Sequence, residues 1–372
     1  MSFLSLFIRR LYANDNSKNE DEKKLKKFKN HFLITFTALL LMALTACGGG
    51  NQGASGNNSS GSGGSGSKEP ITIKLAHVGS EEHQNQIGAV KFKELIEEKS
   101  NGEITVQIFH SGQLGGEDDA IEGIQTGTID MTAVAADSAP ANIVPELNVF
   151  GIPYLFKDRQ HLYKVLDGEI GQEILNLSTE KGLRALGYWE IGFANFTNSK
   201  REVKTPEDMK GLKIRVQPAP IWDEFMKRLN ALPTPMDFTE LYSAMEQGVV
   251  DGQENPIATI NAMKFYEVNP YIALTRHTYK ANIVLVSDKL WNKLDDEQKK
   301  FMEDAVHETY EYQREYLDQK EKETIETLKA TGKVTITEPD LDAFRKVADG
   351  LETTVADKVP GELVERIKGA AE

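Results

Sequence analysis

Apolar and polar positions alternate in short segments near the start of the folded part of the chain, and helical spacing fills the intervals between them. Residues 71–76 and 104–109 alternate in the manner of strands, and a third strand is expected at 129–134. Apolar side chains recur at helical spacing over 86–99 and 117–125, and each segment is followed shortly by a glycine. This β-α-β-α-β order is typical of a parallel sheet with right-handed crossovers.

A second set of strand patterns predicts a second lobe. Segments 183–189 and 193–198 are strand-like and carry the chain out of the first lobe, and 271–274 and 281–287 carry it back. We therefore expect two crossing connections between the lobes. The elements expected inside the second lobe are a strand at 213–217 and helices at 221–230 and 238–247.

A long helix is predicted at 295–330, because this run contains neither glycine nor proline and its apolar residues recur at helical spacing. At a rise of 1.5 Å per residue the helix is about 50 Å long, enough to run across both lobes. A coiled-coil stub is the alternative, but the apolar stripe lacks a sustained heptad. We interpret the helix as a brace.

The first part of the chain has the features of an export signal rather than of a folded domain. A lysine-rich segment precedes an apolar run at 32–44, which is too short to span a bilayer and suits a signal-peptide core. The run ends close to Cys47, in a context that resembles a bacterial lipobox. We expect 1–46 to be a lipoprotein signal peptide and 47–69 to be a lipidated cysteine with a flexible Gly/Ser-rich tether. A buried thiol is the alternative for Cys47, but its glycine-rich surroundings offer nothing to bury it.

Composition narrows the function classes. The formal net charge of −14 at pH 7 argues against nucleic-acid binding, because phosphate contacts need clustered Lys and Arg. With one cysteine, the chain cannot form an internal disulfide. The histidines lack metal-ligand spacing, and no nucleophile elbow, P-loop or dinucleotide-binding motif is present. The sequence therefore predicts no metal, no cofactor and no enzymatic activity.

One short strand ends in an arginine that is suited to bind a carboxylate. Ile214 and Val216 alternate with polar neighbours, and Pro218 ends the strand because it cannot donate to a sheet ladder. Arg215 therefore lies beside a loop at the end of a strand, where open α/β sheets bind ligands. Its guanidinium can donate two parallel hydrogen bonds to a carboxylate. A solvated surface arginine is the alternative.

Several sequence blocks, in their order and spacing, resemble one protein family. The blocks are 112–117, 121–131, 150–156, 208–218, 233–238, 249–256 and 265–268. They are similar to the substrate-binding proteins of tripartite ATP-independent periplasmic (TRAP) transporters, the DctP-like family. The resemblance runs from about residue 71 to the C-terminus, and the joint spacing of the blocks is more specific than any single block.

The resemblance implies an α/β, two-lobed periplasmic-binding-protein-like fold, with a ligand cleft between the lobes, two crossing strands and the long helix bracing both. We expect 70–192 with 281–320 to form lobe I and 193–280 with 321–372 to form lobe II. The implied function is that of an extracytoplasmic subunit that captures an organic acid and delivers it to a small and a large membrane subunit. The protein is expected to be a monomer, lipid-anchored on the extracytoplasmic face of the cell membrane.

The resemblance also implies which residues bind the ligand. Arg215 matches the family arginine that pairs with the ligand carboxylate, Asn255 an amide that contacts this carboxylate, and Phe238 an aromatic ring that packs on the ligand. The alternatives are a turn former for Asn255 and a core residue for Phe238. Further residues expected to line the cleft are Val78, Asp137, Ser138, Trp189 and Asn195. A turn or helix-cap role is the alternative for Asp137, and core packing is the alternative for Trp189.

One position departs from the family pattern. Ala194 stands where family members often carry a second arginine. The loss of this cation favours a monoacid, or a hydroxylated or sugar acid, over a doubly charged dicarboxylate. The rival hypotheses are a binding lipoprotein of an ATP-driven importer, a ligand-sensing partner of a receptor, and an unrecognised secreted enzyme.

Overall fold

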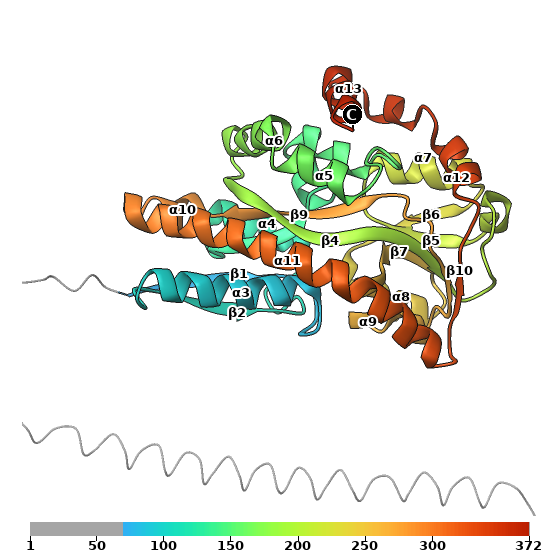
Figure 1. Cartoon of the computed structure of the whole chain (residues 1–372), viewed down its shortest axis with the longest axis horizontal. Coiled ribbons are helices and arrows are strands. Elements are labelled where there is room, and N and C mark those ends of the chain that lie inside the picture. Colours follow the sequence, from blue (N-terminus) through green and yellow to red (C-terminus); the bar gives the residue numbers. More distant parts are fainter. Residues whose placement is uncertain (1–69, 372) are drawn as a thin grey trace, which may run out of the picture. The chain divides into compact units, whose positions relative to one another are not determined.

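A path of hydrogen-bonded strands runs through residues 70–371, the part of the chain that the computed structural model describes (Figure 1). Cys47 and the predicted signal peptide and tether, 1–46 and 47–69, lie outside the described residues. Within 70–371, no helix is both long enough and apolar enough to cross a membrane.

The first half of the sheet has the predicted parallel order. Strands β1 (Ile71–Ala76), β2 (Ile104–Phe109) and β3 (Met131–Ala135) are parallel and lie in the order β2-β1-β3. The helices between them are α3 (Gln84–Lys99) and α4 (Glu117–Thr126). The predicted β-α-β-α-β unit is confirmed.

Strand β4 (Ala185–Asn198) is continuous, although the sequence predicts two segments at 183–189 and 193–198. Its first part pairs antiparallel with β9 (Tyr279–Val286), which in turn is antiparallel to β3. A β-bulge interrupts this pairing next to Gly192, whose φ of 120° lets the strand bend without ending. The strand therefore passes without a break from one half of the sheet to the other.

The second half of the sheet is built around the end of β4. Strand β7 (Gly252–Pro256) is antiparallel to β4, and β5 (Lys213–Val216) is parallel to β7 and to β6 (Leu232–Pro235). The sheet tolerates the prolines of β6 because this strand lies at the edge, where a missing N–H breaks no ladder. Strand β8 (Tyr271–Ala273) pairs with β4 and with β10 (Thr335–Thr337).

Helices lie on both sides of these strands in Figure 1. Besides α3 and α4, they include α5 (Arg159–Leu166), α6 (Glu169–Glu180), α7 (Pro220–Arg228), α8 (Leu241–Glu246), α9 (Ile257–Ala262), α10 (Asp288–Trp291), α12 (Leu341–Ala348) and α13 (Gly361–Gly369). Short 3-10 turns occur at Ala139–Asn142, Pro145–Gly151, Pro206–Met209, Phe238–Glu240, Phe265–Glu267 and Leu351–Val355. The helix predicted at 238–247 thus consists of a 3-10 turn followed by α8.

The predicted long helix is α11 (Asp296–Ala330), which crosses in front of β4 in Figure 1. The carboxylate of Asp295 caps it by accepting a hydrogen bond from the backbone N–H of Gln298. The helix packs against α3, β4 and α9, elements from both predicted lobes. Gly88 of α3 allows the close approach, because a Cβ there would lie 2.6 Å from the Gln313 amide nitrogen. The long helix is confirmed, while the division into lobes stays a prediction.

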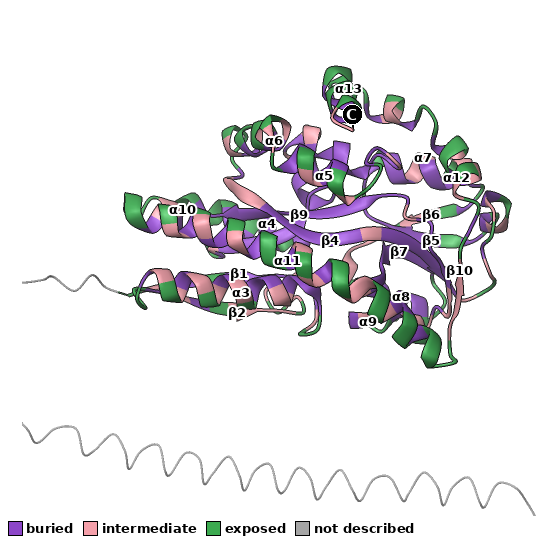
Figure 2. Cartoon of the chain, in the orientation of Figure 1, coloured by how far each residue is buried: buried purple, intermediate pink, exposed green. Residues whose placement is uncertain are grey.

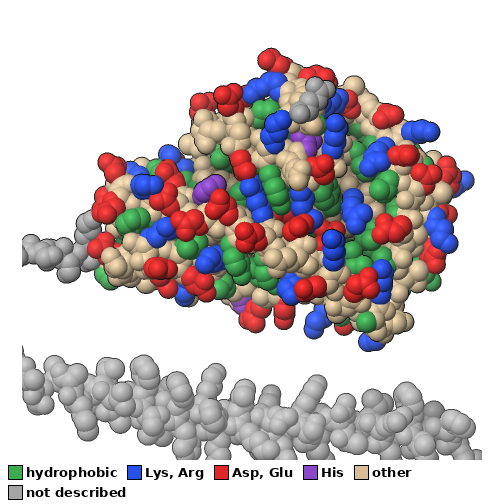
Figure 3. Space-filling model, viewed as in Figure 1, with side chains coloured by type: hydrophobic (Ala, Val, Ile, Leu, Met, Phe, Trp, Pro, Cys, Tyr) green, Lys and Arg blue, Asp and Glu red, His purple; other side chains and the backbone are tan. Residues whose placement is uncertain are grey.

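Buried residues concentrate in the central strands, and the outer faces of the helices are exposed (Figure 2). The larger hydrophobic cluster follows the sheet and includes the fully buried side chains of Trp189, Trp222 and Phe225. A second cluster joins side chains from 241–274 to the end of α11. Acidic and basic side chains are interspersed over the face shown in Figure 3.

Candidate ligand-binding site

A small cavity of about 40 Å³ lies where the two halves of the sheet meet the beginnings of α3 and α4. Ends of β1, β3 and β5 contribute to its wall, which is where open α/β sheets place ligands. The predicted site residues that line it are Val78, Arg215, Phe238 and Asn255. The other lining residues are His83, Asn85, Glu117, Ala135, Ile191, Gln217, Glu254, Lys280 and Asn282.

Arg215 is a buried arginine, with 3% of its surface exposed, so it is not the solvated surface residue of the alternative hypothesis. Its Nε and Nη2 both donate to the carbonyl oxygen of Met236, at 3.0 and 2.8 Å. Among the described residues, no carboxylate lies within ion-pair distance of this guanidinium, and Nη1 has no hydrogen-bond partner. Burial lowers the pKa of Arg215, although Glu254 and Glu117 act in the opposite direction. A buried cation of this kind is suited to an incoming anion.

Asn255 and Phe238 line the same cavity as this guanidinium. Asn255 lies on β7, and its side-chain N–H donates to Gln253. The Phe238 ring lies 6.0 Å from the Arg215 guanidinium and 6.3 Å from the His83 ring. One wall therefore combines a cation, an amide and an aromatic face.

Lys280 is a second cation in the cavity and was not predicted from the sequence. It lies on β9 with 4% of its surface exposed. Its ammonium lies 3.3 Å from Oδ2 of Asp137 and 3.2 Å from Oε1 of Glu254, and it donates to Oε1 of Gln217. Burial raises the pKa of Glu254, but Lys280 and His277 more than offset this and hold it below its usual value. Glu254 is therefore an ionised partner of Lys280.

The structure places the predicted residue Asp137 in this ion cluster rather than on the cavity wall. Its Oδ2 accepts from Nζ of Lys280 and from Nε1 of Trp222, both at 3.3 Å. Asp137 is 1% exposed, and its side chain contacts Lys280 rather than the cavity. Asp137 lies in the turn that follows β3, as the turn alternative has it, and does not cap the 3-10 turn at Ala139–Asn142.

Glu117 begins α4 and is the carboxylate nearest to the predicted residue Ser138. Its Oε1 accepts from the backbone N–H of Ala135 at 3.3 Å. Burial raises the pKa of Glu117, and the hydrogen bond from Ser138 and the charge of Arg215 oppose that rise. Ser138 does not line the cavity, and its contact with the site is through Glu117.

Two asparagines and a histidine also line the cavity. Asn282 donates from Nδ2 to Oδ1 of Asn85 at 2.7 Å, and its own Oδ1 is buried without a hydrogen-bond partner among residues 70–371. Nδ1 of His83 accepts from the backbone N–H of Asn85 at 3.1 Å. Burial lowers the pKa of His83 to about 3, so this histidine is neutral. These three side chains carry no charge, and Oδ1 of Asn282 is an acceptor without a donor.

Two further predicted site residues lie outside the cavity. Trp189 is fully buried and packs on Phe92, with ring centroids 6.1 Å apart, so the core-packing alternative describes it. The Asn195 side chain donates to the carbonyl of Phe193 and accepts from the backbone N–H of Arg276. Both hold β4 in place, and only Ile191 of this strand reaches the cavity wall.

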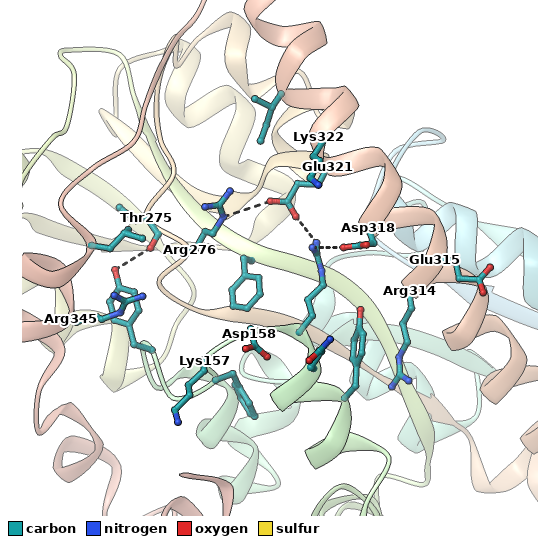
Figure 4. A pocket seen from close by; sticks show the side chains of 18 residues that line it. Lys157, Asp158, Thr275, Arg276, Arg314, Glu315, Asp318, Glu321, Lys322 and Arg345 are labelled. Atoms are coloured by element: carbon teal, nitrogen blue, oxygen red, sulfur yellow. Dashed lines mark hydrogen bonds and ion pairs between the residues drawn. The ribbon is translucent and has the colours of Figure 1, made fainter. Parts of the chain in front are cut away.

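A larger hollow of about 1310 Å³ lies elsewhere, between α5, α11 and α12 (Figure 4). It is open to solvent, and its arginine Arg159 already has carboxylate partners. Arg159 pairs with Glu190 at 3.2 Å, with Asp318 at 3.0 Å and with Glu321. We place the ligand in the smaller cavity in spite of its size, because a buried guanidinium without a carboxylate partner is found there.

The residues missed at the sequence level carried weak signals. Glu254 belongs to the block 249–256, but the sequence alone does not distinguish it as a site residue. Lys280 precedes the strand predicted at 281–287, and a lysine in an otherwise apolar buried strand is the feature that would have drawn attention to it.

Comparison with known proteins identifies the family. Residues 75–357 match the model of the bacterial extracellular solute-binding protein, family 7 (DctP). The 2,3-diketo-L-gulonate-binding periplasmic protein of Escherichia coli K12 is 34% identical over 286 residues, which cover 77% of this chain and 86% of the relative.

Solved structures agree with the match. A TRAP periplasmic solute-binding protein from Polaromonas sp. JS666, bound to D-erythronate, is 34% identical with a TM-score of 0.77, over 80% of this chain and 98% of that one. Another such protein, from Sulfurospirillum deleyianum with bound succinate, is 30% identical with a TM-score of 0.77. The match covers 82% of this chain and 100% of that chain. The fold is therefore the two-lobed α/β fold of these proteins, and the chain belongs to the DctP family of TRAP solute-binding proteins.

Proposed function

We propose that this protein is the extracytoplasmic solute-binding subunit of a TRAP transporter, and that Arg215 holds the carboxylate of an organic acid in the cavity. Membership of a substrate-binding family favours binding over catalysis. The solved relatives carry D-erythronate and succinate, which are both carboxylic acids.

The observation that carries this proposal is the state of Arg215. Its guanidinium is removed from water, has no carboxylate within ion-pair distance in the described part of the chain, and keeps Nη1 without a hydrogen-bond partner. Burial of an unpaired charge is costly, and a ligand carboxylate would supply the missing counter-charge. Asn255 lies on the same cavity wall and offers a neutral hydrogen bond to the same group.

The ligand we propose is a monoacid with hydroxyl groups, such as a sugar acid. Ala194, the position at which the family resemblance leads us to expect a second arginine, is buried and brings no cation. The acceptor Oδ1 of Asn282 lacks a donor among residues 70–371, and a ligand hydroxyl would provide one.

Replacement of Arg215 tests the proposal. Truncating one partner of a buried charge pair costs about 2–5 kcal/mol. At about 1.4 kcal/mol per decade, Arg215→Ala should weaken acid binding roughly 30-fold to several-thousand-fold in calorimetry. The matched control is Arg276→Ala in the larger hollow, which should bind with wild-type affinity. The reverse pattern, with loss in Arg276→Ala and none in Arg215→Ala, would move the site to that hollow.

Delivery to a small and a large membrane subunit, by a monomer tethered through Cys47, completes the proposed function. Uptake of labelled acid in cells should depend on this protein together with both membrane subunits. Uptake that survives deletion of this protein would contradict the delivery step.

A further inference from the structure

Two cations line the cavity in the part of the chain that the structure describes, and their surroundings differ. Arg215 has Nη1 available for a ligand, because only its Nε and Nη2 are used by the carbonyl of Met236. The ammonium of Lys280 has no N–H donor left for a ligand. An ammonium has three N–H donors, and three protein oxygens surround this one, from Asp137 at 3.3 Å, Glu254 at 3.2 Å and Gln217.

The charges around Lys280 leave no attraction for a further anion. Asp137 and Glu254 are each 1% exposed, so water screens neither of them. Together they place two carboxylates on one ammonium, which gives this cluster a surplus of negative charge. A second ligand carboxylate would therefore meet repulsion, and Ala194 adds no cation to offset it.

A buried hydrogen-bond acceptor of the cavity lacks a donor. Oδ1 of Asn282 is buried and has no hydrogen-bond partner among residues 70–371, whereas Oε2 of Glu254 faces Nε2 of His277 at 3.8 Å. A hydroxyl group can donate to an oxygen such as Oδ1 of Asn282, whereas an ionised carboxylate cannot. The chemistry of the wall and the charge balance of Lys280 therefore point to the same ligand class.

We infer that Glu254 and Asp137 determine ligand specificity by holding Lys280, so that the site accepts acids with one carboxylate and several hydroxyls and rejects dicarboxylates. This inference rests on the proposed function and adds a selection step to it. Glu254 and Asp137 act through Lys280 and are positioning residues, and Lys280 is a cation kept away from the ligand.

Two acids of four carbons test the inference by calorimetry. D-Erythronate has one carboxylate and hydroxyls on the other carbons, and succinate has two carboxylates. The wild-type protein should bind D-erythronate about tenfold or more tightly than succinate. Glu254→Gln keeps the shape of the side chain and removes one of the two negative charges on Lys280. The ratio of the two affinities should then move about tenfold toward succinate.

A double variant separates the role of Lys280 from a general change in charge. In Glu254→Gln/Lys280→Gln the freed ammonium is gone, so the gain in succinate binding should disappear. Asp137→Asn, which releases Lys280 from its other side, should move the ratio in the same direction as Glu254→Gln. Glu190→Gln is the matched control, because this buried carboxylate pairs with Arg159 and does not line the cavity. It should leave the ratio unchanged.

The ratio within one sample is insensitive to partial unfolding, since unfolded protein binds neither acid. A ratio that stays unchanged in both Glu254→Gln and Asp137→Asn would overturn the inference, and so would a succinate gain that persists in the double variant. A wild-type preference for succinate would also overturn it. By contrast, wild-type-like affinity in Arg215→Ala would overturn the proposed function itself.

Discussion

At the scale of single residues, His83 shows how burial decides the chemistry of a side chain. Its Nδ1 caps α3 by accepting from the Asn85 N–H, and its Nε2 lies 3.1 Å from Oγ1 of Thr259 on α9. Burial lowers its pKa to about 3, and burial likewise lowers the pKa of His77 to about 4. Both histidines are therefore neutral in the folded protein over the physiological range.

Acidification should destabilise the protein through these histidines. As pH falls below about 6.5, the unfolded chain binds protons that folded His83 does not accept, so the free energy of unfolding decreases until the pH approaches the folded pKa. Between pH 7 and pH 5, one such histidine should lower the free energy of unfolding by about 2 kcal/mol. His83→Asn keeps a good N-cap and should remove about that much of the pH dependence in urea unfolding.

The control for this measurement is His307→Asn. The His307 side chain is 64% exposed on α11, so its replacement should leave the pH dependence as it is in the wild type. If the free energy of unfolding changes with pH equally in His83→Asn and in the wild type, His83 does not titrate in the manner described.

At the scale of elements, the connections between the predicted lobes are β4, β9 and α11. Arg159 on α5 binds Glu190 of β4 together with Asp318 and Glu321 of α11, and Glu321 also lies 3.8 Å from Arg276 (Figure 4). This ion-pair network lies beside the larger hollow and ties a helix, a strand and the long helix together. The β-bulge at Gly192 is the place where β4 bends.

We expect the predicted lobes, 70–192 with 281–320 and 193–280 with 321–372, to close on the ligand. Bends in connecting elements absorb the change in backbone angles that closure requires. Small-angle scattering should give a smaller radius of gyration with saturating D-erythronate than without ligand. Arg215→Ala at the same acid concentration should show no decrease. Equal radii for the wild type with and without ligand would favour a rigid site.

At the scale of the whole molecule, net charge and the predicted lipid anchor bear on where the protein is located. The formal net charge of the full chain is −14, and acidic and basic groups are interspersed over the face shown in Figure 3. A net negative charge favours solubility and does not attract the protein to anionic lipid. Retention at the membrane would then depend on the predicted lipid anchor at Cys47.

Cys47→Ser tests the anchor. The parent protein should sediment with membranes and carry acyl chains by mass spectrometry, because two chains give durable binding. The serine variant should lack the lipid and appear in the soluble or exported fraction. If the variant remains acylated and sediments like the parent, Cys47 is not the lipidation site.

Local patterns determined much of the fold. The strands at 71–76 and 104–109 and the helices α3, α4 and α11 follow from periodicity, because the spacing of apolar residues within one segment already shows which face is buried. Sheet pairing is not local. Two predicted segments fuse into β4, and a proline-rich stretch becomes the edge strand β6, because strand partners supply the hydrogen bonds.

Some residues of the candidate site could be predicted from the sequence, and others were found only in the tertiary structure. Arg215, Asn255 and Phe238 were predicted because each lies in a block that resembles a family motif, and the structure brings all three to one cavity. The ion cluster of Lys280 was decided by tertiary structure alone. Its oxygen partners Asp137, Gln217 and Glu254 come from distant parts of the chain, and only sheet register brings them within 3.3 Å or less of one ammonium. Whether a charge is available to a ligand depends on such neighbours, because a buried ion is neutralised by what lies next to it in space.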